Sequence, residues 1–244
     1  FPRFRSPSRW SSLSIDDLGG RRGKPIIVAG GKRVAIQMIG KVRFRTAERV
    51  QGTPKALRFT FDGRKWFVTF ACVDVPAKPL PSTGATVGVD LGLRHLVATS
   101  DGEMFENARP FKADRLILER AARRLSRRKK HSCRRAEARR LLAKKYARVA
   151  NVRRENAISI ARNLVARYDT VFVEDLNIKG LARSVLAKSI HDAAWGVIRH
   201  WLNVKAEEAG RSVVAVDPRG TSQTCSKCGV VAKHKLSLDV RVFK

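Results

Sequence analysis

Several features are scarce in this chain of 244 residues, and each scarcity excludes a class of protein. Cysteines are too few and too unevenly spread for a disulfide framework: Cys72, Cys133, Cys225 and Cys228. No stretch approaches about 18 consecutive apolar residues, which excludes a membrane-spanning helix. The first residues contain no apolar block followed by a cleavage site, so we expect a protein of the cytoplasm and not a secreted one.

Acidic residues are also scarce, with 21 Asp and Glu against 51 Lys and Arg, and the formal net charge is +30. A charge of this size favours a polyanionic partner, because basic proteins are strongly attracted to phosphate backbones. Arg supplies 33 of the basic residues, and its planar guanidinium suits bidentate phosphate contacts. Apolar residues make up 43% of the chain, which is enough to build a hydrophobic core, so we expect a folded protein.

The first third of the chain has the pattern of a small basic β domain. Apolar and polar residues alternate over residues 56–61, and a second β-rich run over residues 65–75 follows Asp62-Gly63, a dipeptide typical of hairpin turns. Residues 76–84 contain three Pro and break this periodicity. We therefore predict a β domain over residues 1–75 and a linker over 76–84.

The segment 112–154 contains 18 Lys and Arg against 3 Asp and Glu, so its net charge of +15 is half of the total. Apolar residues recur there at helical spacing, and neither Pro nor Gly interrupts the segment. We predict two long basic helices that break near His131, with the second running towards Tyr168. The candidate nucleic-acid-binding residues lie along these helices: Arg123, Arg124, Arg127, Arg128, Lys129, Lys130, Arg134, Arg135, Arg139 and Arg140.

The rest of the chain reads as an α/β domain over residues 85–220, with the basic helices inserted at about 112–168. A helix is predicted to begin near Ser189, because Ser189 and Asp192 stand at the spacing of a capping box. Apolar strand patterns occur on both sides of the inserted helices, in segments 86–92, 96–100, 169–177 and 212–218. This order predicts a mixed sheet.

Two carboxylates in these strands are candidate metal ligands. Asp90 interrupts the apolar run 87–92, and Glu174 ends another short apolar run. A carboxylate placed in such a strand is unfavourable unless it is paired, hydrogen-bonded or bound to a cation. If the two strands are neighbours, both oxygens could bind Mg²⁺ or Mn²⁺, and two such ions would support phosphodiester cleavage. The alternative that each acid caps a helix or pairs with an Arg stays open.

Cys225 and Cys228 have the spacing of one half of a zinc site. Two intervening residues let both thiolates reach one tetrahedral Zn²⁺, and Gly229 permits the tight turn. His234 is a candidate third ligand, while Cys72 and Cys133 belong to other elements, so the other half is not evident. A redox motif is the alternative, but no thioredoxin-like pattern precedes the pair, and zinc is favoured.

Four segments, in this order, resemble the TnpB proteins of bacterial and archaeal insertion sequences, which are similar to type V CRISPR effectors: residues 88–92 (GVDLG), 173–177 (VEDLN), 189–195 (SIHDAAW) and 221–229 (TSQTCSKCG). The resemblance implies an RNase H-like (RuvC) nuclease domain, a partial zinc ribbon over residues 221–244 and a β-barrel-like wedge domain that binds guide RNA. It also implies RNA-guided cleavage of DNA in a prokaryotic cell, near the nucleoid. Guide RNA and target DNA are then the partners, with no membrane and no small-molecule substrate.

By this resemblance, Asp90 and Glu174 are two of three catalytic, metal-binding carboxylates, and Cys225 and Cys228 are one of two zinc-binding pairs. No segment of this sequence matches the family's third Asp or its second Cys pair, and neither Asp217 nor Asp239 stands in the matching motif. We therefore expect a chain truncated at both ends, with weak or absent nuclease activity and an incomplete zinc site. A nucleic-acid-binding protein without catalysis is the alternative, so whether the chain is an enzyme stays open.

Overall fold

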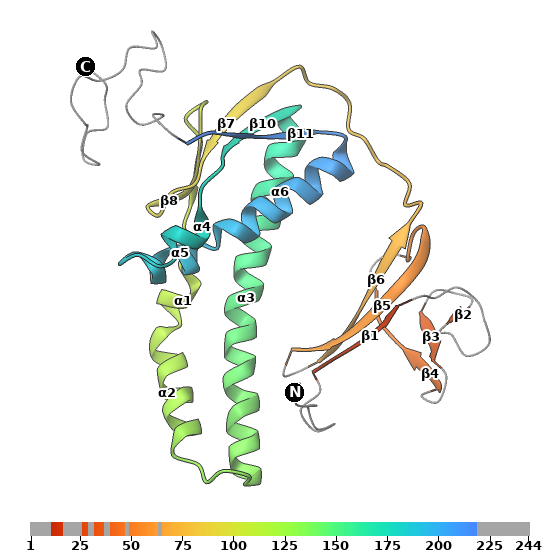
Figure 1. Ribbon diagram of the computed structural model, residues 1–244, viewed down its shortest axis with the longest axis vertical. Helices are drawn as coiled ribbons and strands as arrows, with labels where there is room; N and C mark the ends of the chain where they lie inside the picture. Colours follow the sequence, from red (N-terminus) through yellow and green to blue (C-terminus); the bar gives the residue numbers. More distant parts are fainter. Residues whose placement is uncertain are drawn as a thin grey trace. The chain divides into compact units, whose positions relative to one another are not determined.

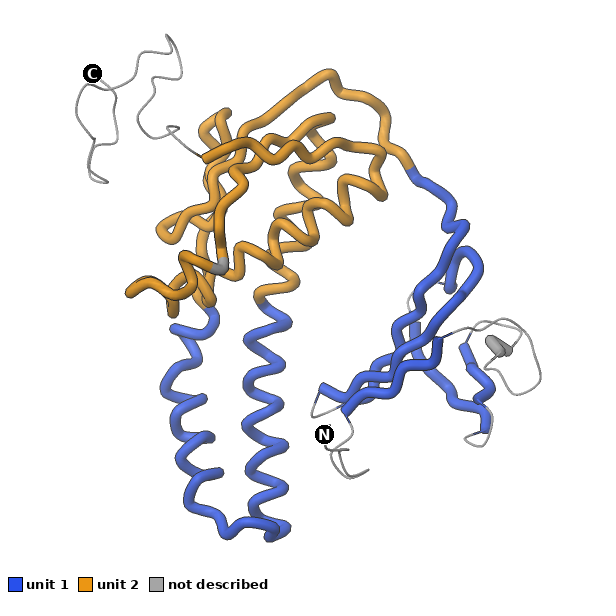
Figure 2. The backbone as a smooth tube through the Cα atoms, viewed as in Figure 1, with its two compact units in different colours: residues 1–78, 110–152 blue, residues 79–109, 153–244 orange. Residues whose placement is uncertain are grey.

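The computed structural model describes residues 11–16, 26–28, 32–36, 40–46, 49–62 and 65–218. The chain divides into two compact units, one of residues 1–78 and 110–152 and the other of residues 79–109 and 153–244 (Figure 2). Cys225 and Cys228 lie outside the described residues. Among the helices of the described part, none is long and apolar enough to cross a membrane.

The β part of the first unit contains two three-stranded antiparallel sheets. The predicted hairpin at Asp62 is confirmed, because β5 and β6 pair along their length and the backbones of Asp62 and Lys65 are hydrogen-bonded (Figure 1). Val34, Ile36 and Leu57 form a small buried core. The strands are β1 Ser12–Asp16, β2 Ile26–Val28, β3 Arg33–Ile36, β4 Gly40–Arg43, β5 Thr53–Phe61 and β6 Trp66–Val73.

The helical part of the first unit is a hairpin of α2 (Arg115–Ser126) and the first part of α3 (Cys133–Arg167), which continues into the second unit after residue 152. The short α1 (Pro110–Ala113) precedes it. The predicted break is confirmed, and His131 turns the chain with a positive φ of 66°. Small and branched apolar residues are buried on both helices: Leu118, Ala121, Ala138 and Val149. Asp114 lies 3.7 Å from Arg148 of α3, so an ion pair joins the two helices near the start of α2.

The second unit is built on a five-stranded mixed sheet in the order β11-β10-β7-β8-β9 (Figure 1). The strands are β7 Thr86–Asp90, β8 His95–Thr99, β9 Met104–Glu106, β10 Thr170–Glu174 and β11 Ser212–Val216. β10 pairs in parallel with both β7 and β11, whereas β8 is antiparallel to its neighbours. Residues of α3 and α6 (Trp195–Ala209) complete the main hydrophobic core against this sheet, for example Leu164 and Leu202. The predicted mixed α/β class is confirmed.

A helix begins close to the predicted start near Ser189, but the predicted capping box of Ser189 and Asp192 is wrong. Ser189 lies inside α5 (Ala187–Ala193), which follows the short α4 (Ile178–Leu181) and begins after Leu186 without a side-chain cap. Ala194 then adopts a left-handed conformation with φ 55°, which ends α5 and starts α6 at Trp195. Alanine rarely adopts this conformation, so no residue in the sequence indicates the break.

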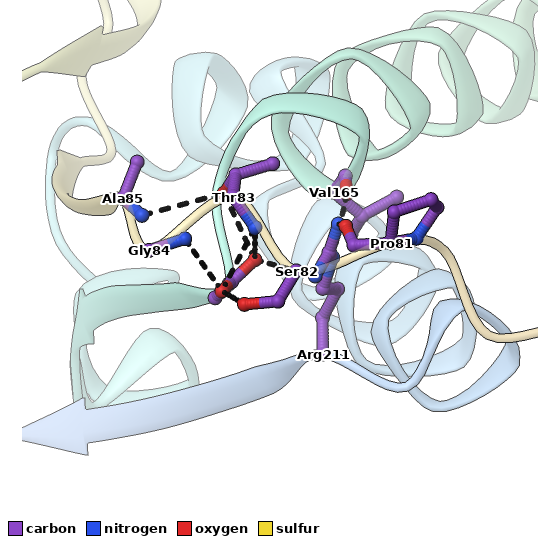
Figure 3. Close-up of polar contacts among 8 residues, drawn as sticks. Pro81, Ser82, Thr83, Gly84, Ala85, Val165 and Arg211 are labelled. Atoms are coloured by element: carbon purple, nitrogen blue, oxygen red, sulfur yellow. Dashed lines mark hydrogen bonds and ion pairs between the residues drawn. The ribbon is translucent and has the colours of Figure 1, made fainter.

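Asp169, at the start of β10, binds the segment that leads into β7. Its carboxylate accepts hydrogen bonds from the Ser82 hydroxyl and from the backbone N–H groups of Thr83 and Gly84, and it pairs with Arg211 (Figure 3). Arg211 also donates to the carbonyl oxygens of Pro81 and Val165, at 2.7 and 3.1 Å. The hydrogen bonds to the Asp169 carboxylate, chiefly from Ser82 and then from Thr83 and Gly84, hold its pKa well below its usual range.

Candidate functional site

Asp90 and Glu174 end two neighbouring parallel strands at the same edge of the sheet. In the β7–β10 register, Thr86 lies opposite Thr170 and Val89 lies opposite Val173. Asp90 and Glu174 each follow one residue later, so the pairing brings their backbones side by side. The condition that the sequence left open, that the two strands are neighbours, is therefore met.

Both carboxylates lie on the face of the sheet opposite to the main core. Successive side chains of a strand alternate between faces, and Val89 and Val173 are 5% and 3% exposed within the core. Asp90 is accordingly exposed, and Glu174 is half-buried. Asp90 therefore needs no partner to offset burial, because β7 ends at this residue and its carboxylate reaches solvent.

Other acids are found at this edge. Asp175 follows Glu174 and forms an ion pair of 2.7 Å with Arg199 of α6, so its charge is already compensated. Asp217 directly follows β11 and is exposed. Within the described ranges, no three acids, histidines or cysteines are grouped closely enough to enclose a metal ion. Asp90 and Glu174 therefore provide two oxygen donors on an open face.

The turn after Asp90 is tightly constrained. A Cβ on Gly92 would lie 2.7 Å from the carbonyl oxygen of His95, a distance that side chains do not tolerate, so the turn requires glycine at this position. The Gly92 N–H donates to the carbonyl oxygen of Leu96, at 3.3 Å. Asn107 and Arg109 both donate to the carbonyl oxygen of Leu93, at 3.0 and 2.9 Å. The path of the chain beyond Asp90 is therefore fixed by several independent contacts.

Most of the basic residues predicted to bind nucleic acid present their charge to solvent. The exposed ones are Arg123, Arg124, Arg127, Lys129, Lys130, Arg134, Arg139 and Arg140. Arg123 is partly neutralised by Glu119, at 3.5 Å. Arg128, which is half-buried, shares a pocket of about 390 Å³ along α2 with Arg123, Arg124, Arg127 and Arg120. Arg120 was not singled out from the sequence, although its spacing from Arg123, Arg124 and Arg127 places it on the same helical face.

Arg135 differs from the other predicted residues, because its guanidinium is engaged within the hairpin. It donates to the carbonyl oxygens of Leu125 and Arg128, at 3.0 and 2.9 Å. These carbonyl groups lie at the C-terminal end of α2, where the last carbonyl oxygens of a helix have no intrahelical donor and a positive charge is favourable. Arg135 therefore stabilises the turn between the helices.

Comparisons with known proteins identify the family. The sequence model of the family OrfB_IS605, described as "Probable transposase", matches residues 70–185, and the model described as "Cas12f1-like, TNB domain" matches residues 195–244. The first of these matches covers β7, the helical hairpin and β10. The chain belongs to the TnpB family.

Three curated relatives of this TnpB-family chain share one description. A "Putative RNA-guided DNA endonuclease" of Streptomyces pristinaespiralis is 38% identical over 179 residues, which is 72% of this chain and 44% of the relative. InsQ of Escherichia coli K12, which has the same description, is 27% identical over 218 residues, 83% of this chain and 54% of InsQ. A relative from Mycobacterium tuberculosis H37Rv is 32% identical and covers 93% of this chain. The TnpB-family chain spans about half the length of these relatives.

Among solved structures, the TnpB-family chain is similar to a chain in a cryo-EM structure titled as a Cas12f1–sgRNA–target DNA complex. The TM-score is 0.49 and the sequence identity is 18%, over 74% of this chain and 39% of the other.

Proposed function

We propose that this chain supplies the nuclease centre and part of the nucleic-acid-binding surface of an RNA-guided DNA endonuclease of an insertion sequence. The observation that carries the proposal is the parallel pairing of β7 with β10, which places Asp90 and Glu174 at one sheet edge. The names of the relatives support the same activity. We further propose that the sheet of the second unit is a RuvC-type, RNase H-like sheet and that residues 1–75 form a wedge-type domain.

The residues at the sheet edge fit a hard divalent cation. Asp90 and Glu174 offer carboxylate oxygens, the donors that Mg²⁺ and Mn²⁺ prefer, and their open face leaves room for water and for a phosphate as further ligands. Among the described residues, no ion pair includes Asp90. A two-metal centre here would supply an activated water and stabilise the leaving oxygen of a phosphodiester. Asp90 and Glu174 would hold and orient it.

The helical hairpin is the proposed surface for guide RNA and target DNA. Its exposed guanidinium and ammonium groups, together with the five-arginine pocket of α2, are suited to contacts with backbone phosphates. Such contacts give affinity without reading sequence, which suits a protein whose specificity is delegated to base pairing. No further residue is needed on this surface for base recognition.

A zinc site is proposed at Cys225 and Cys228 from their spacing alone. Metal analysis of the purified chain, compared with Cys225→Ser, tests it. The variant is expected to retain less zinc, and equal zinc in both proteins would refute the assignment.

The nuclease proposal is tested by incubating the chain with Mg²⁺ and a labelled single-stranded DNA, beside Asp90→Ala. Because two of the family's three carboxylates are identified in this chain, the expected result is weak cleavage that depends on Mg²⁺ and disappears in Asp90→Ala. Cleavage that survives the substitution would show that the metal-site assignment is wrong. Binding of the DNA without any cleavage would favour the second candidate, a nucleic-acid-binding protein without catalysis, for which the charge of the helical hairpin is the supporting observation.

A further inference from the structure

A tryptophan from a distant segment contacts the turn that follows Asp90. The indole N–H of Trp195 donates to the carbonyl oxygen of Gly92, at 3.1 Å, although 103 positions separate the two residues. Trp195 is 6% exposed and packs in the main core, so its ring approaches the turn from the side of the sheet opposite to the two carboxylates. The contact therefore joins the N-terminus of α6 to the end of β7.

The position of Trp195 is itself set by the local backbone. The left-handed Ala194 separates α5 from α6, which makes Trp195 the first residue of α6. Asp192, at the end of α5, is buried and pairs with Arg153 of α3, at 2.9 Å. α5 is thus tied to α3 immediately before the chain presents the indole to Gly92.

We propose that Trp195 is a positioning residue for Asp90. Its indole N–H holds the turn over residues 91–94 and thereby fixes the direction in which the Asp90 carboxylate leaves the end of β7, beside Glu174. The proposal rests on the proposed function, because it assumes that Asp90 and Glu174 bind a divalent cation together.

The indole N–H of Trp195 contributes a hydrogen bond to the turn, in addition to the packing of the ring in the core. Gly92 is half-buried, and a polar group with reduced access to solvent that loses its partner raises the free energy of the native state. Without the donor, the carbonyl group would turn towards another partner, and Asp90, two residues earlier, would move with it. Gly92 cannot shift freely towards His95, because the backbone already approaches closely there.

The test compares Trp195→Phe with Leu202→Val. Both substitutions remove volume from the core face of α6, since Leu202 is 1% exposed, but only the first removes a donor from the turn. Titration with Mn²⁺, followed by electron paramagnetic resonance, is expected to show roughly tenfold weaker binding for Trp195→Phe and unchanged binding for Leu202→Val. In the metal-free protein, amide hydrogen exchange over residues 91–94 should accelerate in Trp195→Phe alone.

Benzothienylalanine introduced at position 195 provides a second variant, because it keeps the shape of the indole and replaces its N–H with sulfur. It is expected to reproduce both effects, and it decides the question if Trp195→Phe does not fold. Unchanged Mn²⁺ affinity and unchanged exchange in this variant would overturn the proposal. If the unmodified chain binds no Mn²⁺, or if Asp90→Asn binds it equally well, the proposed metal site fails instead, and the positioning proposal falls with it.

Discussion

Val89 of β7 lies directly opposite Val173 of β10 in a parallel register, although the two residues are 84 positions apart in the chain. Both side chains are buried in the core, and this burial fixes the register, because a shift by one residue would expose one strand's apolar set. The next residue on each strand is an acid on the opposite face. The packing of two valines therefore determines where two carboxylates meet.

Loss of either carboxylate is expected to weaken metal binding. Glu174→Gln keeps the size of the side chain but removes a charged oxygen ligand, so the Mn²⁺ affinity should fall by roughly tenfold or more. Glu155→Gln, at an exposed position on α3, removes the same charge from another element and should leave the affinity unchanged. Isothermal titration with Mn²⁺ measures both. Equal losses in the two variants would indicate a general charge effect and contradict a site at Glu174.

The pocket along α2 is expected to bind phosphates. Replacing Arg124 and Arg127 with Ala should weaken the binding of RNA and DNA to a similar extent for all sequences. The slope of log affinity against log salt should become shallower by about one for each phosphate that the variant no longer binds. Arg115→Ala is the matched control, because Arg115 is exposed on the same helix but pairs with Glu119 at 3.5 Å. Fluorescence anisotropy over a salt series gives the slopes, and an unchanged slope in the double variant would exclude phosphate binding at this pocket.

Local patterns in the sequence predicted the elements that depend on local forces. The hairpin at Asp62 and the turn near His131 follow from turn chemistry and from helical periodicity, and both are confirmed. That Asp90 and Glu174 lie side by side could be stated only as a condition, because the sequence alone does not show which strands pair in the sheet.

Other features of the site could not be read from the sequence, because each depends on an interaction between distant residues or on a backbone conformation without a signal. The left-handed Ala194 carries no signal in its residue type. Arg135 resembles its neighbours in sequence, and only the turn brings the C-terminal carbonyl groups of α2 to it. Asp169 reads as the start of a strand, and its partners Ser82 and Arg211 are 87 and 42 positions away.

The pH dependence of stability is expected to include a contribution from Asp169. Folding lowers the pKa of this carboxyl through its bonds to Ser82, Thr83 and Gly84, so the ionised form stabilises the native state above the unfolded pKa near pH 4. This contribution is lost as the pH falls through the lower pKa of the folded state. Asp169→Asn should therefore lower the Tm at neutral pH, and the gap to the unmodified chain should shrink below about pH 4.

Asp74→Asn is the matched control for Asp169→Asn, because Asp74 is exposed and its positive φ of 54° is a conformation that Asn also adopts. Its Tm should follow that of the unmodified chain at every pH. Differential scanning fluorimetry in a pH series measures the three proteins. A gap between Asp169→Asn and the unmodified chain that stays constant into acid would show that the Asp169 carboxylate contributes no ionisation-linked stability.

The ion pair between half-buried Arg153 and buried Asp192 is expected to behave as a coupled unit. Asp192 is 6% exposed whereas Arg153 is 23% exposed, so removing the guanidinium leaves a buried carboxylate without this partner. Arg153→Met should therefore lower the free energy of unfolding by about 3 kcal/mol, and Asp192→Asn by less, because the Arg153 side chain keeps some contact with solvent. The double variant should lose less than the sum of the two, because it leaves neither charge behind. Urea denaturation followed by circular dichroism gives the three values. The exposed pair of Arg115 and Glu119, treated in the same way, should change stability by less than about 1 kcal/mol, and strictly additive losses at Arg153 and Asp192 would show that the two side chains act separately.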